Sequence, residues 1–278
     1  MRKASRYFLC FLLVPLLFSF QQGCLYHRRD CKTVCQFSSM DAFQSGAYGG
    51  WVEYRAIAEK GDFGIGTVDR LDGEMIALEG RFYRIASDGK VHVISPSTLS
   101  PFATVTFFRP EMEFTAADIG DYSGLAAYLD RLLTDKEAFY AIRVDGLFDS
   151  IQTRSVPAQN EPFPALEEAL KKQTFFLFKG INGSMVGFRF PDSCRGVNNP
   201  GYHFHFISND RRSGGHVLEL SLRRARVLVS RIYTLEFELP ASGDTILNSV
   251  TVTGTNRVQP IFPPLAGEDL GGVTIKED

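Results

Sequence analysis

The sequence predicts an α+β, β-rich fold of two lobes, with a mixed β-sheet in the N-terminal lobe and an antiparallel sheet or barrel in the C-terminal lobe. The chain has 24 phenylalanines in 278 residues, mostly in short alternating runs, and such runs favour strands over helices. Short polar or glycine-containing turns separate these runs, whereas only three segments of the sequence have a helical pattern. Strands are therefore expected to dominate both lobes.

The composition is that of a globular protein with a buried core. Apolar residues make up 44% of the chain and charged residues 22%, whereas a disordered chain would carry more charge and fewer aromatic residues. The 30 basic and 32 acidic residues give a net charge of -2, and they form no long basic run. Nucleic acid is therefore not expected as a partner.

The N-terminus has the pattern of a secretory signal. Arg2, Lys3 and Arg6 precede a 14-residue apolar run, residues 7–20, which is too short to span a bilayer comfortably. We interpret residues 1–23 as a signal peptide, so the protein is expected to be exported, whether periplasmic, secreted or lipid-anchored. The alternatives are a buried N-terminal helix and a membrane anchor.

Residues 24–38 are interpreted as a polar leader that precedes the folded part, which we expect to begin near Ser39. Gly23-Cys24 resembles the end of a lipoprotein signal, which would place a lipid anchor on Cys24, although Gln21 stands where such signals usually have leucine. Removal of the signal would leave four cysteines, which an exported protein can pair in any of three ways. These cysteines are Cys24, Cys31, Cys35 and Cys194.

The N-terminal lobe is assigned to residues 39–160. A short helix is predicted over residues 51–61, and a β-meander follows it, with Asp-Gly and Glu-Gly turn signals between runs of four to six residues. Further predictions are a buried strand over 101–110, a helix over 122–133 and a strand over 139–151. The turn signals of the meander are Asp72-Gly73, Glu79-Gly80 and Asp88-Gly89.

The C-terminal lobe is assigned to residues 161–278, and a loop and helix around residues 150–173 are expected to join it to the first lobe. The helix is predicted over 162–173, where two prolines and acidic residues come early and lysines come late, as the helix dipole prefers. Antiparallel strands should follow, whereas the tail from Ala241 gives no clear assignment. These strands are predicted over 174–180, 183–191, 201–208, 215–230 and 232–240.

Three of the five histidines lie on one predicted hairpin, "GYHFHFISNDRRSGGHVLEL". Because side chains alternate along a strand, His203 and His205 point to one side while Phe204 and Phe206 point to the core on the other. The two histidines are about 7 Å apart at the backbone, given a rise of roughly 3.4 Å per residue. The glycines after the loop allow the chain to reverse, and His216 then returns opposite the first pair.

Three converging neutral imidazoles are the ligand set of catalytic zinc sites, which keep a fourth position open. The hairpin therefore predicts a Zn²⁺ site with His203, His205 and His216 as ligands, and we place it between the two lobes. The alternative is that the three are ordinary surface residues, as we expect for His27 and His92. A cupin-like metal barrel fits less well, because no glutamate follows the His-x-His pair within residues 207–215.

Several blocks of the sequence resemble the α-acetolactate decarboxylase family, in the family's order. They are "GDFGIGTVDRLDGEMIALEGRFYRI", "SPFATVTFF", "RSVPAQNEPFPAL", "GSMVGFRFP" and the histidine hairpin, so the resemblance covers residues 39–240. It implies a zinc enzyme that converts 2-acetolactate to acetoin and carbon dioxide, built from two β-rich domains and usually a homodimer. Its zinc ligands fall on the three hairpin histidines.

The resemblance also implies roles for residues far from the hairpin. The family's acidic residue falls on Glu74, its threonine on Thr67 and its arginine before Val-Pro on Arg154. A metal on the ketone oxygen would stabilise the enediolate left by loss of carbon dioxide. Arg154 suits the substrate carboxylate, because a guanidinium barely deprotonates, and Glu74 suits proton transfer if its surroundings raise its pKa. Taken alone, each charge reads as a solvated surface residue.

The C-terminal tail departs from the family, which returns a second glutamate to the site from this region. By distance from the hairpin, Glu268 is the first candidate for this catalytic residue and Glu277 the next.

Two other functions remain open from the sequence. One is an exported metal-binding protein that has lost the chemistry, and the other is a zinc hydrolase with Glu74 as its general base.

Overall fold

The structure is a computed structural model that describes residues 31–240 and the backbone of residues 273–275. The predicted signal peptide, the leader cysteine Cys24 and both tail glutamates, Glu268 and Glu277, lie outside the described residues. Within the described ranges, no helix is long and apolar enough to cross a membrane. No disulfide joins Cys31, Cys35 and Cys194 to one another.

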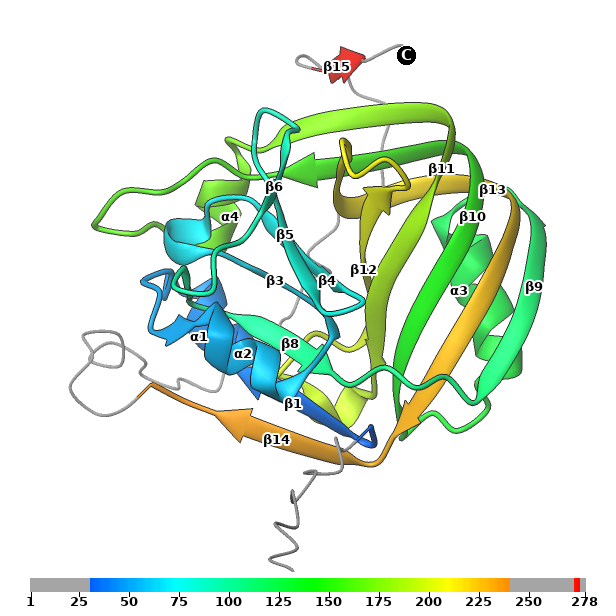
Figure 1. Cartoon of the computed structure of the whole chain (residues 1–278), viewed down its shortest axis with the longest axis horizontal. Coiled ribbons are helices and arrows are strands. Elements are labelled where there is room, and N and C mark those ends of the chain that lie inside the picture. Colours follow the sequence, from blue (N-terminus) through cyan, green and yellow to red (C-terminus); the bar gives the residue numbers. More distant parts are fainter. Residues whose placement is uncertain (1–30, 241–272, 276–278) are drawn as a thin grey trace, which may run out of the picture.

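The first sheet has seven strands and forms the half of the molecule that contains α1 and α2 (Figure 1). It is mixed because β1 pairs with β14 in parallel and with β8 in antiparallel fashion, which confirms the mixed sheet predicted from the sequence. A two-stranded ribbon of β2 (Val52–Glu53) and β7 (Leu99–Ser100) lies beside it. In sheet order, the seven strands are β14 (Thr234–Glu238), β1 (Thr33–Phe37), β8 (Ala103–Thr106), β3 (Phe63–Thr67), β4 (Glu74–Leu78), β5 (Arg81–Ile85) and β6 (Val91–Val93).

The second sheet curls into a ring, because β10 pairs with β13 as well as with β11. The pairings β11 with β12 and β12 with β13 complete this small antiparallel barrel, as the sequence predicted. Its long strands form the curved half of the molecule in Figure 1. The strands of this sheet are β9 (Met112–Ile119), β10 (Phe139–Ser155), β11 (Thr174–Phe190), β12 (Gly201–Ser208), β13 (Gly214–Ile232) and β15 (Val273–Ile275), which pairs in parallel with β11.

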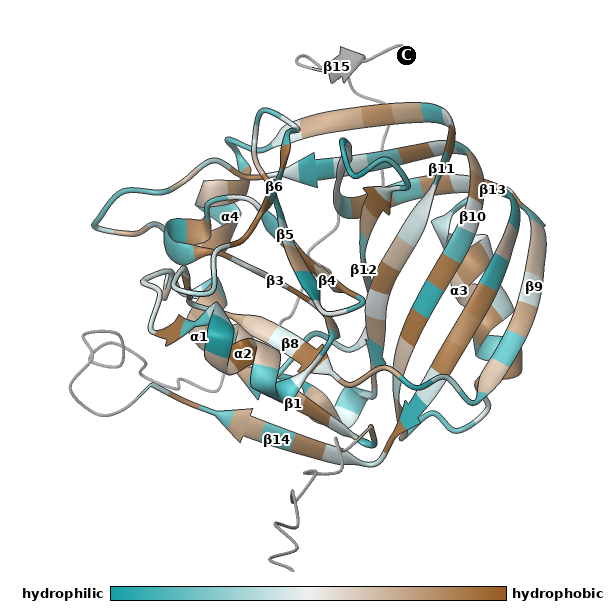
Figure 2. Ribbon diagram, in the orientation of Figure 1, coloured by the Kyte–Doolittle hydropathy of each residue, from teal (hydrophilic) through white to brown (hydrophobic). Residues whose placement is uncertain are grey.

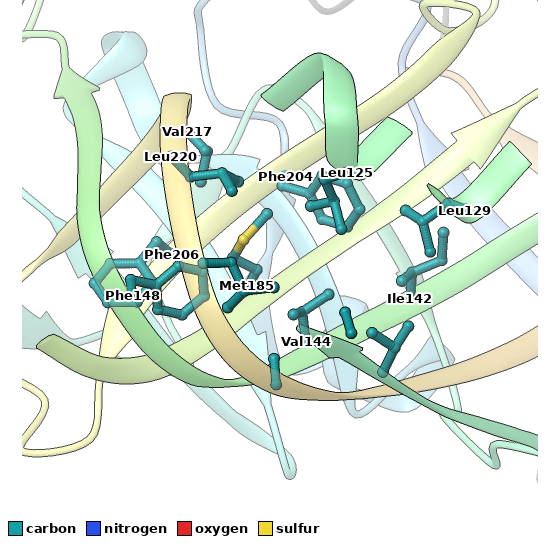
Figure 3. Packing of buried hydrophobic residues seen from close by; sticks show 14 of the residues in the cluster. Leu125, Leu129, Ile142, Val144, Phe148, Met185, Phe204, Phe206, Val217 and Leu220 are labelled. Atoms are coloured by element: carbon teal, nitrogen blue, oxygen red, sulfur yellow. The ribbon is translucent and has the colours of Figure 1, made fainter. Parts of the chain in front are cut away.

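The helices are short and lie outside the sheets. The longest, α3, packs Leu125 and Leu129 against one face of the barrel, next to Phe204, as Figure 3 shows. Asp121 caps its start by accepting a hydrogen bond from the backbone N–H of Gly124 at 2.6 Å. The α-helices of the described residues are α1 (Met40–Gln44), α2 (Tyr54–Lys60), α3 (Tyr122–Leu132) and α4 (Leu166–Leu170).

Strand β12 is buried on both faces. Phe204 and Phe206 belong to the core inside the second sheet, where Phe206 contacts Phe148 (Figure 3). Residues of the opposite face, such as Ile207, pack against Ile76 and Ile85 of the first sheet. Apolar residues accordingly recur along the long strands in Figure 2, and the two sheets face each other across a shared core.

Several boundaries differ from those expected. The folded part begins before Ser39, because residues 33–37 form strand β1 between β8 and β14. β10 continues through Ser155, so Arg154 lies on a strand and not in a linker, and α4 covers only five residues of the predicted 162–173 helix. The strands predicted over 174–180 and 183–191 are one continuous strand, β11.

The two sheets do not follow the order of the chain. β9 and β10 precede residue 160 but pair in the second sheet, while β14 follows β13 and crosses back to the first sheet (Figure 1). The division into residues 39–160 and 161–278 as separate domains stays a prediction.

Candidate metal centre

The hairpin of β12 and β13 brings the predicted histidines together. His205 and His216 are directly opposite in the strand register, and His203 lies two residues earlier on β12. The three ring centroids are 4.8 to 5.3 Å apart, and one nitrogen from each ring lies within 4.8 Å of the others. The interpretation of these histidines as scattered surface residues does not match this arrangement.

The histidines face the first sheet and are shielded from solvent. His205 and His216 are buried and His203 is half-buried, whereas His92 is exposed on β6. His205 Nδ1 lies 2.8 Å from the backbone carbonyl oxygen of Met75 on β4. A carbonyl only accepts hydrogen bonds, so Nδ1 carries the proton and the lone pair of a neutral His205 is on Nε2.

The electrostatics of the site favour neutral imidazoles. Burial lowers the pKa of His203 to about 3, and burial with neighbouring positive charge lowers the pKa of His205 and His216 well below the ordinary value. Neutral imidazole is the form that binds a metal ion. At neutral pH all three rings are therefore ready to act as ligands.

The spacing of the nitrogen atoms also fits a tetrahedral ion. His203 Nε2 and His216 Nδ1 are 3.0 Å apart. Two imidazole nitrogens bound to one zinc ion at distances near 2.0–2.1 Å lie about 3.3 Å apart at a tetrahedral angle. The nitrogens of His203 and His216 are therefore spaced nearly as two ligands of one divalent ion would be, and a nitrogen of His205 lies within 4.8 Å of both.

A buried ion pair borders the three histidines. Arg154 is the strand partner of His216, and its Nη1 donates a hydrogen bond to Glu74 Oε1 at 2.9 Å. The second carboxylate oxygen, Oε2, is 3.5 Å from His205 Nε2. Both side chains are at most 10% exposed. Burial raises the pKa of Glu74, although Arg154 counteracts this, and burial lowers the pKa of Arg154.

Thr67 lies beside the ion pair, because it is the strand partner of Glu74 in the β3–β4 hairpin. Its buried hydroxyl donates a hydrogen bond to the carbonyl oxygen of Gly73 at 2.6 Å. The contact fixes the turn directly before Glu74. A role of Thr67 in substrate binding stays a prediction.

The tail reaches this side of the molecule. Val273 pairs with Phe175 on β11, and Phe175 in turn pairs with Arg154 on β10. Two strand spacings separate the backbones of Val273 and Arg154, which is about 10 Å. The assignment of Glu268 stays a prediction, because Glu268 lies outside the described residues.

No signal in the sequence points to the Met75 carbonyl that orients His205. Any residue on β4 would present a backbone carbonyl, so its side chain carries no information about this contact. Only the register of the first sheet against β12 reveals it.

A second group of potential ligands lies on the first sheet, where Cys35, Glu236 and Glu238 converge. Lys60 already supplies a positive charge there, 2.6 Å from Glu236 and 3.0 Å from Glu238. Burial and the two glutamates raise the pKa of the Cys35 thiol to about 12, so it stays protonated. This group is satisfied as an ion-paired cluster.

The fold and the site together define a class. A β-rich chain with three converging, neutral histidines, two of them buried, and an adjacent carboxylate–guanidinium pair has the architecture of a metalloenzyme. Residues 34–248 match the family described as alpha-acetolactate decarboxylase, and the chain belongs to this family.

Relatives and a solved structure agree with this assignment. The alpha-acetolactate decarboxylase of Methylococcus capsulatus is 42% identical, covering 80% of this chain and 86% of the relative. The protein of the same name from Methanosarcina mazei is also 42% identical, covering 75% and 73%. The crystal structure of alpha-acetolactate decarboxylase from Bacillus subtilis strain 168 is 38% identical with a TM-score of 0.75, covering 78% of this chain and 92% of that one.

Proposed function

We propose that this chain decarboxylates 2-acetolactate to acetoin and carbon dioxide, with Zn²⁺ as the metal held by His203, His205 and His216. The observation that carries the proposal is that these converging neutral histidines lie next to the Glu74–Arg154 pair. Relatives that share most of the chain are named for this activity. A divalent ion at this site would act as a Lewis acid for the oxygen atoms of the substrate.

Arg154 is suited to bind the substrate carboxylate. Its guanidinium has five N–H donors and stays charged, and the contact with Glu74 engages Nη1. A guanidinium can bind a carboxylate with two parallel hydrogen bonds, which fixes the plane of the departing group. His216 is the strand partner of Arg154, so the carboxylate would be held beside the histidines.

Glu74 is suited to carry the proton that the reaction needs. Loss of carbon dioxide leaves an electron pair on the carbon that bore the carboxylate, and one proton added there completes acetoin. Burial raises the pKa of Glu74, which favours a carboxyl group that can hold and release a proton. Oε1 is engaged by Arg154, whereas Oε2 faces His205 and is the oxygen positioned for this transfer.

Three further features belong to the same proposal. Residues 1–23 would direct export, and Glu268 of the tail would supply a second acidic group at the site. The chain would act as a homodimer. The position of β15 next to β11 supports the role of Glu268, because it brings the tail to the side of the barrel that carries Arg154.

The test is conversion of racemic 2-acetolactate by the purified protein, with acetoin and carbon dioxide measured together with metal content. Equal amounts of both products are expected, with about one metal ion per chain. His205→Ala should lose metal and activity, whereas exposed His92→Ala should keep both. Bound metal without turnover would instead support a metal-binding protein, and ester hydrolysis without decarboxylation would support a zinc hydrolase.

A further inference from the structure

Two hydroxyl groups flank Arg154 on β10. Thr153 precedes the arginine and Ser155 follows it, and both side chains are fully buried. Each hydroxyl donates a hydrogen bond to a backbone carbonyl, and the two acceptors lie on different sheets. The backbone on either side of Arg154 is thus held to both sheets.

Thr153 connects the arginine to the histidine hairpin. Its Oγ1 donates to the carbonyl oxygen of Gly214 at 2.9 Å, two residues before His216. Gly215 lies between them with φ +139°, and a Cβ on this residue would come within 2.6 Å of the Arg154 carbonyl oxygen and 3.0 Å of the Thr153 side chain. The hydrogen bond from Thr153 and the absence of a side chain on Gly215 together allow β10 and the start of β13 to approach closely.

Ser155 connects the arginine to the first sheet. Its Oγ donates to the carbonyl oxygen of Ile85 on β5 at 2.7 Å. Ile85 is the strand partner of Glu74, so this bond lies one residue from Arg154 on one side and one strand from Glu74 on the other. It holds the two members of the buried ion pair in register across the space between the sheets.

We propose that Thr153 and Ser155 are positioning residues, the first setting Arg154 relative to His216 and the second setting it relative to Glu74. The inference rests on the proposed function, because it assigns these residues to the metal site and the carboxylate site of the same reaction. It predicts that the two hydroxyls control different measurable properties. Loss of Thr153 affects the metal ligand, whereas loss of Ser155 affects the group that binds substrate.

Thr153→Val keeps the shape of the side chain but removes the bond to Gly214. We expect Zn²⁺ affinity, measured by competition with a chromophoric chelator, to fall about tenfold or more, as removal of groups that orient metal ligands typically does. Thr153→Ser keeps the hydroxyl and should restore most of this affinity. Thr153→Ala serves the same comparison if the valine variant does not fold.

Ser155→Ala should leave Zn²⁺ affinity within about twofold of the wild type and raise KM for acetolactate about tenfold, with a smaller change in kcat. This split is the signature of a lost contact that holds ground state and transition state alike. Thr106→Val is the matched control, because Thr106 is a buried threonine on β8 whose hydroxyl donates to the carbonyl oxygen of Thr33 on the neighbouring strand β1 at 2.7 Å, a bond that involves neither the ion pair nor the histidines. It should lower the melting temperature but change neither metal affinity nor KM.

The outcomes separate this inference from the proposed function. A wild-type protein that binds no Zn²⁺ or makes no acetoin contradicts the proposed function. If the wild type does both, and the Thr153 and Ser155 variants match Thr106→Val in metal affinity, KM and kcat, the two hydroxyls are merely structural and the positioning role is wrong. Metal affinity that falls in Thr153→Ser as far as in Thr153→Val also contradicts it.

Discussion

The buried pair of Glu74 and Arg154 allows a quantitative prediction about the site. Arg154→Met keeps much of the length and apolar stem of the side chain but removes its charge, so the Glu74 carboxylate loses its positive partner. Both groups are at most 10% exposed, and water cannot readily replace the lost contact. The protein should therefore be clearly less stable.

The magnitude follows from the geometry of the pair. Opposite unit charges at the observed 2.9 Å attract by roughly 6 kcal/mol at an effective dielectric constant of about 20, before desolvation is subtracted. Removing one partner of such a buried pair typically costs about 3–5 kcal/mol. We expect a loss in this range for Arg154→Met.

Urea unfolding of the metal-free protein measures this loss without a contribution from metal binding. Glu74→Gln and the double variant complete a double-mutant cycle. Because the double variant leaves no unpaired charge, its loss should be smaller than the sum of the single losses by about 1–3 kcal/mol. Additive losses, or a loss below about 1 kcal/mol for Arg154→Met, would show that the pair contributes little and would refute this reasoning.

Three further predictions concern separate parts of the molecule. His205→Ala should abolish metal binding and acetoin formation, while His92→Ala should behave as the wild type in the same metal analysis and activity assay; an active His205→Ala would contradict the assigned ligand set. At pH 8, Cys35 should react with iodoacetamide at least about tenfold more slowly than an exposed thiol, because its side chain is buried and its pKa is raised from 9.0 to about 12. Peptide mapping by mass spectrometry measures this, and rapid native labelling would argue against it. Asp121→Ala should lower the unfolding free energy by about 0.5–2 kcal/mol, because α3 loses its N-cap, while kcat stays unchanged. An unchanged midpoint of urea unfolding would show that the cap is dispensable.

The histidine hairpin could be predicted because its determinants are local. Alternation along a strand puts His203 and His205 on one side, and a short turn with glycines returns His216 opposite them. Their burial depends instead on how the first sheet packs on β12. That contact joins residues separated by more than a hundred positions, such as Met75 and His205.

The errors in strand boundaries have a similar origin. The predicted break between the strands 174–180 and 183–191 falls between Gly180 and Gly183, yet Gly183 lies inside β11, where a Cβ would meet the ring of Phe206 at 2.3 Å. In the sequence, a glycine that makes room for a neighbouring ring looks the same as a glycine in a turn. Residues 33–37, interpreted from the sequence as part of a polar leader, likewise form a strand through pairing with β14 and β8.

Arg154 illustrates the limit for the site. Nothing local distinguishes it from a surface arginine, and only the resemblance to the family selected it. Its position in the site depends on the strand register, since the β10–β13 pairing places Arg154 opposite His216 and the first sheet supplies Glu74. Side chains brought together from three strands in this way cannot be identified from the spacing of residues along the chain.

Reconstitution of the metal-free protein with Zn²⁺ tests the central claim most directly. The account predicts that acetoin formation from 2-acetolactate is negligible without metal, rises in proportion to added Zn²⁺ and reaches a plateau at about one ion per chain. Full activity of the metal-free protein would contradict the account, and so would stoichiometric binding of Zn²⁺ at the three histidines without formation of acetoin.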